Sequence, residues 1–291
     1  MATQLTTTKI KTLISDPKYR IELHDRVHEE TERLYALVNE MNPSNDGEAV
    51  KKAKAWMEKI EAESKTLRQL FAYGCYFGTE DQAGIWTRSL NRLGGLVHTN
   101  GLRAMISLQL YPAMLTFYSG GVAAVAAGNA PNLHALLSAV YKEPHLGSGL
   151  LAERTNGWLL DANEGNAILG LERRKTPLSD HVHDIIAANF PDTLIVEENF
   201  ALEYDRWEVL LSMVVAFDRK KQESGQWAPV GRFAWRREPN GKDGLGILLQ
   251  EIESHQQNWP PLTVGLFGSS IKEAKEAHEC VKGLAQRVSF F

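Results

Sequence analysis

Two histidines near the N-terminus have the spacing of a metal site. His24 and His28 are four residues apart, so they share one face of a helix, and Asp25 stands between them. Zinc hydrolases with an H-E-x-x-H pattern have the same spacing, and there the glutamate activates water. Asp25 is shorter than that glutamate, and the sequence offers no confirmed third ligand. We therefore expect no metal, and we keep as the alternative a hydrolase with a histidine-containing site between two lobes, its metal ligands being His24 and His28.

A second pair of histidines, His181 and His183, cannot bind one ion together. Residues two apart on a helix point in nearly opposite directions. The flanking acids Asp180 and Asp184 instead suit the first turns of a helix, where the helix dipole favours negative charge. A single histidine such as His181 can still contact a ligand or a partner, because imidazole serves many chemical roles near neutral pH.

A basic and aromatic cluster follows later in the chain. Trp227, Arg232, Trp235 and Arg236 stand within ten residues of one another. Arginine and tryptophan recur together at the energetic centres of protein interfaces and on nucleic-acid surfaces. The competing interpretation is structural, because arginine stems and tryptophan rings also cover hydrophobic cores.

The elements that must position these residues are mostly helices. Apolar residues recur with helical spacing over about residues 16–41, 50–74, 79–97, 104–128 and 133–140. We expect a mainly α protein with a helical bundle lobe over residues 1–142 and an irregular connector over residues 143–175. A second, mostly helical lobe is expected over residues 176–291, with short strands near 227–236, where polar and apolar residues alternate.

One long uncharged stretch must be weighed as a membrane span. No Asp, Glu, Lys or Arg occurs between Arg103 and Lys142, and Gly120, Ala124 and Gly128 repeat every fourth residue. That repeat lets helices approach closely in lipid. Polar residues interrupt the stretch, however, and a spanning helix needs about 18 nearly uninterrupted apolar residues. We expect a buried central helix and no membrane contact.

The composition narrows the possible functions. The 291 residues carry 32 Lys and Arg against 36 Asp and Glu, a formal net charge of −4. That balance argues against a protein whose main task is binding nucleic acid. The two cysteines and the lack of a secretory signal fit a cytoplasmic protein. Because no nucleotide-binding motif is complete, we expect no cofactor.

Three segments together resemble a known group of proteins. They are Leu108–Ala113 with Tyr118 and Gly121 of the following helix, Lys175–His181, and Trp227–Trp235. They resemble the helical C-terminal region that follows SIR2-like NAD-hydrolysing or other effector modules in some bacterial anti-phage defence proteins. The resemblance implies that the helical part senses or assembles while the effector does the chemistry. This chain shows neither the Gly-Ala-Gly-x-Ser loop nor the His-Gly pair of the SIR2 type. By this resemblance, either the effector is a separate polypeptide or this chain is one domain of a longer protein.

Together, these observations predict a non-enzymatic interaction, sensing or assembly protein, as a component of a bacterial anti-phage defence system. We expect the binding residues to be Lys175, His181, Arg232 and Trp235. The expected partner is a protein, with an effector subunit as one candidate. A homo-oligomer is also open, because residues 50–74 carry about three heptads of seam-like spacing, which suit either an antiparallel pair of helices within the chain or a dimer.

Overall fold

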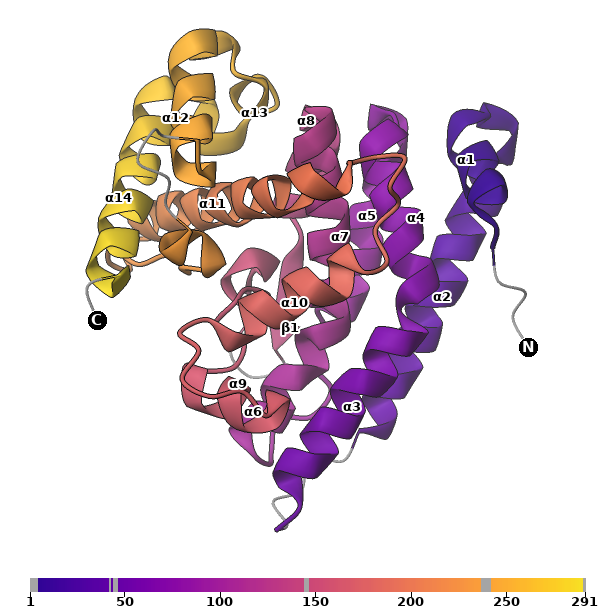
Figure 1. Ribbon diagram of the computed structural model, residues 1–291. Helices are drawn as coiled ribbons and strands as arrows, with labels where there is room; N and C mark the ends of the chain where they lie inside the picture. The colour runs from indigo at the N-terminus through magenta and orange to yellow at the C-terminus, as the bar shows by residue number, and fades with distance from the viewer. Residues whose placement is uncertain (1–4, 42, 44–46, 144–146, 237–241, 290–291) are drawn as a thin grey trace.

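Helices dominate the fold, as the sequence predicts. The computed structural model describes residues 5–41, 43, 47–143, 147–236 and 242–289, and within those ranges its only sheet is a two-stranded antiparallel one. This confirms the mainly α class with a small β element. The first helix and the last lie on opposite sides of the molecule (Figure 1).

Capping residues mark the start of some of the N-terminal helices and turns. α1 (Thr7–Ser15) is followed by α2 (Arg20–Glu40), and Asp16 between them accepts a hydrogen bond from the backbone of Lys18. α3 (Ala49–Glu63) and α4 (Lys65–Phe77) are separated only by Ser64. α5 (Glu80–Leu93) begins with a capping box formed by Thr79 and Gln82. These caps satisfy backbone groups that a helix end would otherwise leave unpaired.

The uncharged stretch forms the centre of the fold. α6 (Arg103–Ser107) leads into α7 (Tyr111–Ala127), which is buried on all sides, and α8 (Ala130–Leu137) packs against it. Pro112 lies in the first turn of α7, and Gly128 ends the helix with a left-handed φ of 62°. Among the described helices, only the segment Arg103–Ala127 is long and apolar enough to cross a membrane, and 89% of its apolar window is buried inside the protein. Such burial is typical of the core helix of a soluble protein.

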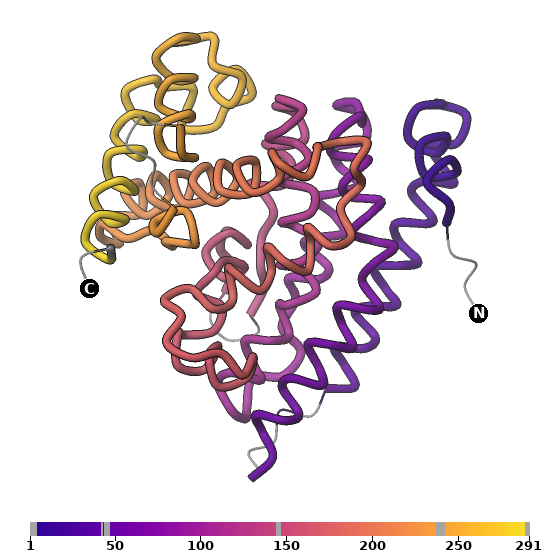
Figure 2. The backbone as a smooth tube through the Cα atoms, viewed as in Figure 1, coloured from indigo at the N-terminus to yellow at the C-terminus, as the bar shows by residue number. Residues whose placement is uncertain are grey.

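The second half of the chain packs onto this centre mainly through one long helix. The helices there are α9 (Ala162–Leu169), α10 (Pro177–Ala187), α11 (Glu197–Lys221), α12 (Gly244–His255), α13 (Pro260–Thr263) and α14 (Ile271–Ser289). α11 lies across α7 and packs against it, while α12 and α14 pack against α11 on the side of the molecule opposite α1 (Figure 2). Further contacts join α10 to α7 and α13 to α8. One hydrophobic core contains residues from both predicted lobes, so packing is continuous across residues 143–175.

The β element is not where the sequence analysis placed it. Residues 227–236 contain no strand, and Arg232–Trp235 form a 3-10 helix instead. The alternation is misleading because every residue from Ala228 to Ala234 is buried, so it does not separate a core face from a solvent face. The strands are β1 (Val140–Glu143) and β2 (Gly147–Leu150). The connector over 143–175 therefore contains β2 and α9 and is not irregular throughout, while its residues 144–146 lie outside the described part.

Candidate functional site

The three segments that carry the resemblance meet at one buried carboxyl group, that of Glu208 on α11. The hydroxyl of Ser179 on α10 donates a hydrogen bond to Glu208 Oε1 at 2.7 Å, and the backbone N–H of Arg232 donates to Ser179 Oγ at 3.0 Å. The hydroxyl of Tyr118 on α7 donates to Glu208 Oε1 at 3.4 Å. We call these residues, together with Tyr204, Asp205 and Gly231, the Glu208 cluster.

Two glycines allow this close approach. A Cβ atom at Gly231 would lie only 2.1 Å from Glu208 Oε2, and a Cβ atom at Gly121 on α7 would lie 2.2 Å from Cε2 of Trp207 on α11. Both distances are far inside van der Waals contact, so no other residue type fits without displacing its neighbour. The glycines therefore let both α7 and the segment before the 3-10 helix pack closely against neighbouring side chains of α11.

The electrostatics of Glu208 follow from its burial. Burial raises the pKa of Glu208 to about 8, although the hydrogen bond from Ser179 and the charge of Arg232 act in the opposite direction. Within the described residues, its second oxygen, Oε2, has no hydrogen-bond partner. At neutral pH the carboxyl group is therefore mostly protonated and uncharged.

Arg232, one of the predicted binding residues, lies inside this cluster. Its side chain is 2% exposed, and its Nε atom lies 3.2 Å from Asp205 Oδ1. The guanidinium carbon also lies 5.6 Å from the centroid of the Tyr204 ring. Burial raises the pKa of Asp205 to about 6, against the opposing effect of the Arg232 charge. Arg232 therefore stabilises the interior, and a partner at the surface cannot contact its guanidinium.

His181, a second predicted binding residue, joins α10 to the N-terminal helices. Its Nε2 atom lies 2.7 Å from Glu61 Oε1, and the hydroxyl of Tyr111 donates to the same oxygen at 2.8 Å. Burial acts to raise the pKa of Glu61, but the hydrogen bonds from His181 and Tyr111 outweigh it and hold the pKa below its usual range. His181 is thus half-buried and engaged within the chain.

The other two predicted binding residues lie at the surface. Lys175 is exposed just before α10, and Trp235 is 36% exposed at the end of the 3-10 helix. The structure thus buries or half-buries the side chains of Arg232 and His181, whereas the side chains of Lys175 and Trp235 are exposed to solvent.

The polar groups of the Glu208 cluster are closed to substrates. Ser179, Tyr118 and Tyr204 are at most 1% exposed. A serine nucleophile needs an open face from which the attacked atom can approach, together with a base. Ser179 has a carboxyl neighbour but no open face, and its hydroxyl instead joins α10 to α11 and to the backbone of Arg232.

The alternative metal pair lacks a third ligand. His24 and His28 stack on the exposed face of α2 with ring centroids 6.4 Å apart. Glu32, the acid one turn further on, is held by Arg92 through two hydrogen bonds of 2.6 and 2.8 Å. In the ranges that the structure describes, no group of three or more His, Cys, Asp or Glu side chains could hold a metal ion. The site therefore consists of two histidines beside Arg92, and the positive charge of Arg92 disfavours a bound cation.

An aromatic groove lies where the first half of the chain meets the connector. This cavity of about 520 Å³ contains two exposed tryptophans, Trp158 and Trp227, which are 44% and 36% exposed. We call it the tryptophan groove. Its apolar lining also includes Leu96, Ile106, Leu110 and Leu159, and its charged lining consists of Arg103, Glu143, Glu153 and Arg154.

Both tryptophan rings are held by their neighbours. The indole N–H of Trp158 donates to the carbonyl of Val230 at 2.9 Å, and its backbone N–H donates to Asn156 Oδ1 at 2.9 Å. The ring of Trp227 is covered by the Arg219 guanidinium, whose carbon lies 4.7 Å from the ring centroid. The groove therefore presents fixed aromatic surfaces.

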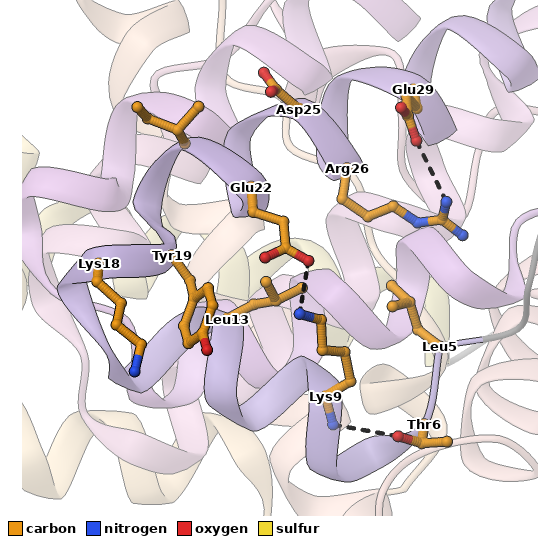
Figure 3. Close-up of a pocket in the computed structure, with 11 residues that line it drawn as sticks. Leu5, Thr6, Lys9, Leu13, Lys18, Tyr19, Glu22, Asp25, Arg26 and Glu29 are labelled. Atoms are coloured by element: carbon orange, nitrogen blue, oxygen red, sulfur yellow. Dashed lines mark hydrogen bonds and ion pairs between the residues drawn. The ribbon is translucent and has the colours of Figure 1, made fainter.

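A larger hollow of about 830 Å³ lies between α1 and α2 near the N-terminus (Figure 3). Its charged side chains neutralise one another: Lys9 Nζ lies 2.6 Å from Glu22, and Arg26 lies 3.3 Å from Glu29. Because these charges are already paired, the hollow offers little to a charged ligand.

No family model matches the chain, and neither a curated protein nor a solved structure matches it.

Sequence reasoning missed Ser179, Glu208 and Trp158. The sequence contains one signal for Glu208, because it stands beside Trp207 in the middle of an apolar stripe on α11. A carboxylate is costly to bury, so an acid at such a position indicates a special role. For Trp158 the only signal was a large aromatic residue inside a glycine-rich segment.

Proposed function

We propose that the chain is a non-enzymatic interaction protein that binds a protein partner in the tryptophan groove. The observation that carries the proposal is the pair of fixed, exposed rings of Trp158 and Trp227 in one cavity. Tryptophan is enriched at the centres of protein interfaces. A ring that is already immobilised loses little conformational freedom on binding, so more of its contact energy remains as affinity.

The charges at the groove favour an uncharged partner segment. Arg154 lies 3.2 Å from Glu143, and Arg219, which covers Trp227, lies 3.1 Å from Glu153. Since these charges are balanced within the chain, an acidic or basic segment gains little there. We infer that the partner inserts an apolar or aromatic side chain between the rings.

The closure of the Glu208 cluster supports a binding role over a catalytic one. The hydroxyl of Ser179 and the carboxyl group of Glu208, which would suit acid–base chemistry, are buried between helices. The open tryptophan groove instead contains aromatic surface and paired charges. The resemblance extends the proposal: the partner is an effector subunit of a bacterial anti-phage defence system, and the chain acts in the cytoplasm as its sensing or assembly component.

Photo-crosslinking tests the proposal with a matched control. A photo-reactive phenylalanine analogue replaces Trp227 in one variant and Trp235 in another. Both native residues are 36% exposed, but Trp235, a binding residue expected from the sequence, does not line the groove. In the native cells, we expect a discrete crosslinked protein from position 227 and none from position 235. Equal capture from both positions, or none from 227, contradicts docking in the groove.

A further inference from the structure

We infer that Glu208 and Ser179 are positioning residues for the tryptophan groove: their hydrogen-bonded network fixes the chain segment that holds Trp158, so ionisation of the Glu208 carboxyl group moves that ring. This inference rests on the proposed function for its biological meaning. The coupling itself depends only on contacts within the chain.

The first link runs from the ring to the segment before the 3-10 helix. The Trp158 indole donates to the carbonyl oxygen of Val230 at 2.9 Å. Val230 is 4% exposed and is followed directly by Gly231 and Arg232. A shift of this buried segment therefore changes the hydrogen bond that orients the indole.

The second link runs from this segment to Glu208. The backbone N–H of Arg232 donates to Ser179 Oγ, which in turn donates to Glu208 Oε1. Gly231 packs so closely on the same carboxyl group that a Cβ atom would overlap it. The segment of Val230, Gly231 and Arg232 is thus attached to the Glu208 carboxyl group, in addition to the hydrogen bond from Ser212 on α11 to the carbonyl of Pro229 and the pairing of Arg232 with Asp205.

A third link reaches Trp158 through the chain itself. Gly157, its immediate neighbour, packs on Ser179, so that a Cβ at Gly157 would lie 3.1 Å from Ser179 Cβ and 3.8 Å from the Cα of Gly231. Trp158 is therefore attached to the cluster both through its indole and through the preceding residue. Movement of Ser179 acts on both attachments together.

Charged and titratable groups around Glu208 explain why its ionisation disturbs the network. Asp205 on α11 repels a second negative charge, and Arg232, the cation that faces it, is already paired with Asp205. Tyr118 on α7 and Tyr204 on α11 are buried phenols whose pKa values are raised well above the usual range by burial, so they stay neutral. Among the described residues, no unpaired positive charge faces an ionised Glu208, and its Oε2 atom accepts no hydrogen bond.

The helices are long and packed on several sides, whereas the segment around Val230 is short and lies outside regular α structure. We therefore expect the segment around Val230, and not the helices, to change its position when Glu208 loses its proton. The indole of Trp158, bonded to Val230, moves with it.

Fluorine NMR of the full chain labelled with 5-fluorotryptophan tests the coupling without any partner. The Trp158 resonance is assigned by its loss in Trp158→Phe, and spectra are recorded from pH 6 to pH 9.5. We expect this resonance to shift with a midpoint near pH 8, the pKa of Glu208, and to stay constant in Glu208→Gln. The variant Glu253→Gln, which removes an exposed carboxyl group on α12, should behave as the unaltered chain does.

Ser179→Ala provides a second variant that keeps the Glu208 carboxyl group. Its Trp158 resonance should be displaced already at pH 6, because the link to the Arg232 backbone is lost. A Trp158 resonance that does not titrate in the unaltered chain, or titrates equally in Glu208→Gln, overturns the inference. If Trp158 titrates as expected while crosslinking from position 227 fails, the coupling stands and the docking proposal alone is refuted.

Discussion

Replacing Glu208 by glutamine should change how the stability of the protein depends on pH. The carboxyl pKa rises from its ordinary value of 4.5 to about 8 on folding. Between these values the folded state binds a proton that the unfolded state has released. The Glu208 contribution to stability is therefore fully present below pH 4.5 and is lost as the pH rises through 8.

The magnitude follows from that interval. Each pH unit between the two pKa values lowers the free energy of unfolding by about 1.4 kcal/mol. From pH 5 to pH 9 the loss is roughly 4 kcal/mol, a large share of the stability of an ordinary domain. Glutamine has nearly the same shape and cannot ionise, so Glu208→Gln lacks this loss.

Urea unfolding at pH 5, 7 and 9 measures the difference. At pH 5 we expect Glu208→Gln to lie within about 1 kcal/mol of the unaltered chain, the scale of one altered hydrogen bond. At pH 9 we expect the variant to be more stable by about 3 kcal/mol. Glu253→Gln, on the exposed face of α12, should show no such trend. A difference between Glu208→Gln and the unaltered chain that is the same at all three pH values would refute the reasoning.

Three further predictions concern other contacts. Gly231→Ala should lower the free energy of unfolding in urea by more than about 2 kcal/mol, because the new Cβ atom would overlap Glu208. The control Gly283→Ala, in open space on α14, should instead raise it by up to about 1 kcal/mol. Equal effects of the two substitutions would contradict the close packing at Gly231. Glu61→Gln and His181→Asn should each cost about 1–3 kcal/mol, and the double variant should cost less than their sum; strict additivity would show that the pair does not interact. A metal chelator should leave the Tm unchanged, because Arg92 holds Glu32, the acid one turn beyond His24 and His28 that could serve as a third metal ligand. Stoichiometric zinc in the purified protein would contradict this prediction.

Local features of the fold could be predicted from the sequence. The hydroxyl of Thr79 and the amide of Gln82 form a capping box, and Gly128 ends α7 in a left-handed conformation. Each signal depends on residues within a few positions of one another, so the sequence contains it directly. The same applies to Ser270, whose hydroxyl accepts a hydrogen bond from the backbone of Glu273 at the start of α14.

The site could not be predicted in the same way, because its contacts are distant in the chain. Tyr118 and Glu208 are 90 positions apart, and Ser179 and Arg232 are 53 apart. Periodicity shows which face of a helix is apolar, but it does not show which helix that face meets. For Arg232 the sequence leaves two interpretations, a contact with a partner and a structural role, and it does not show that Asp205, 27 positions earlier, lies beside the buried guanidinium.

The affinity of the purified chain for the protein captured from position 227 tests the central claim most directly. Isothermal titration should compare the unaltered chain, the double variant Trp158→Ala with Trp227→Ala, and Trp235→Ala. If the tryptophan groove is the docking site, the double variant should bind at least about 30-fold more weakly, as for the loss of one hot-spot residue of about 2 kcal/mol. Trp235→Ala should bind as the unaltered chain does. Unchanged affinity of the double variant, or equal weakening by Trp235→Ala, would contradict the account.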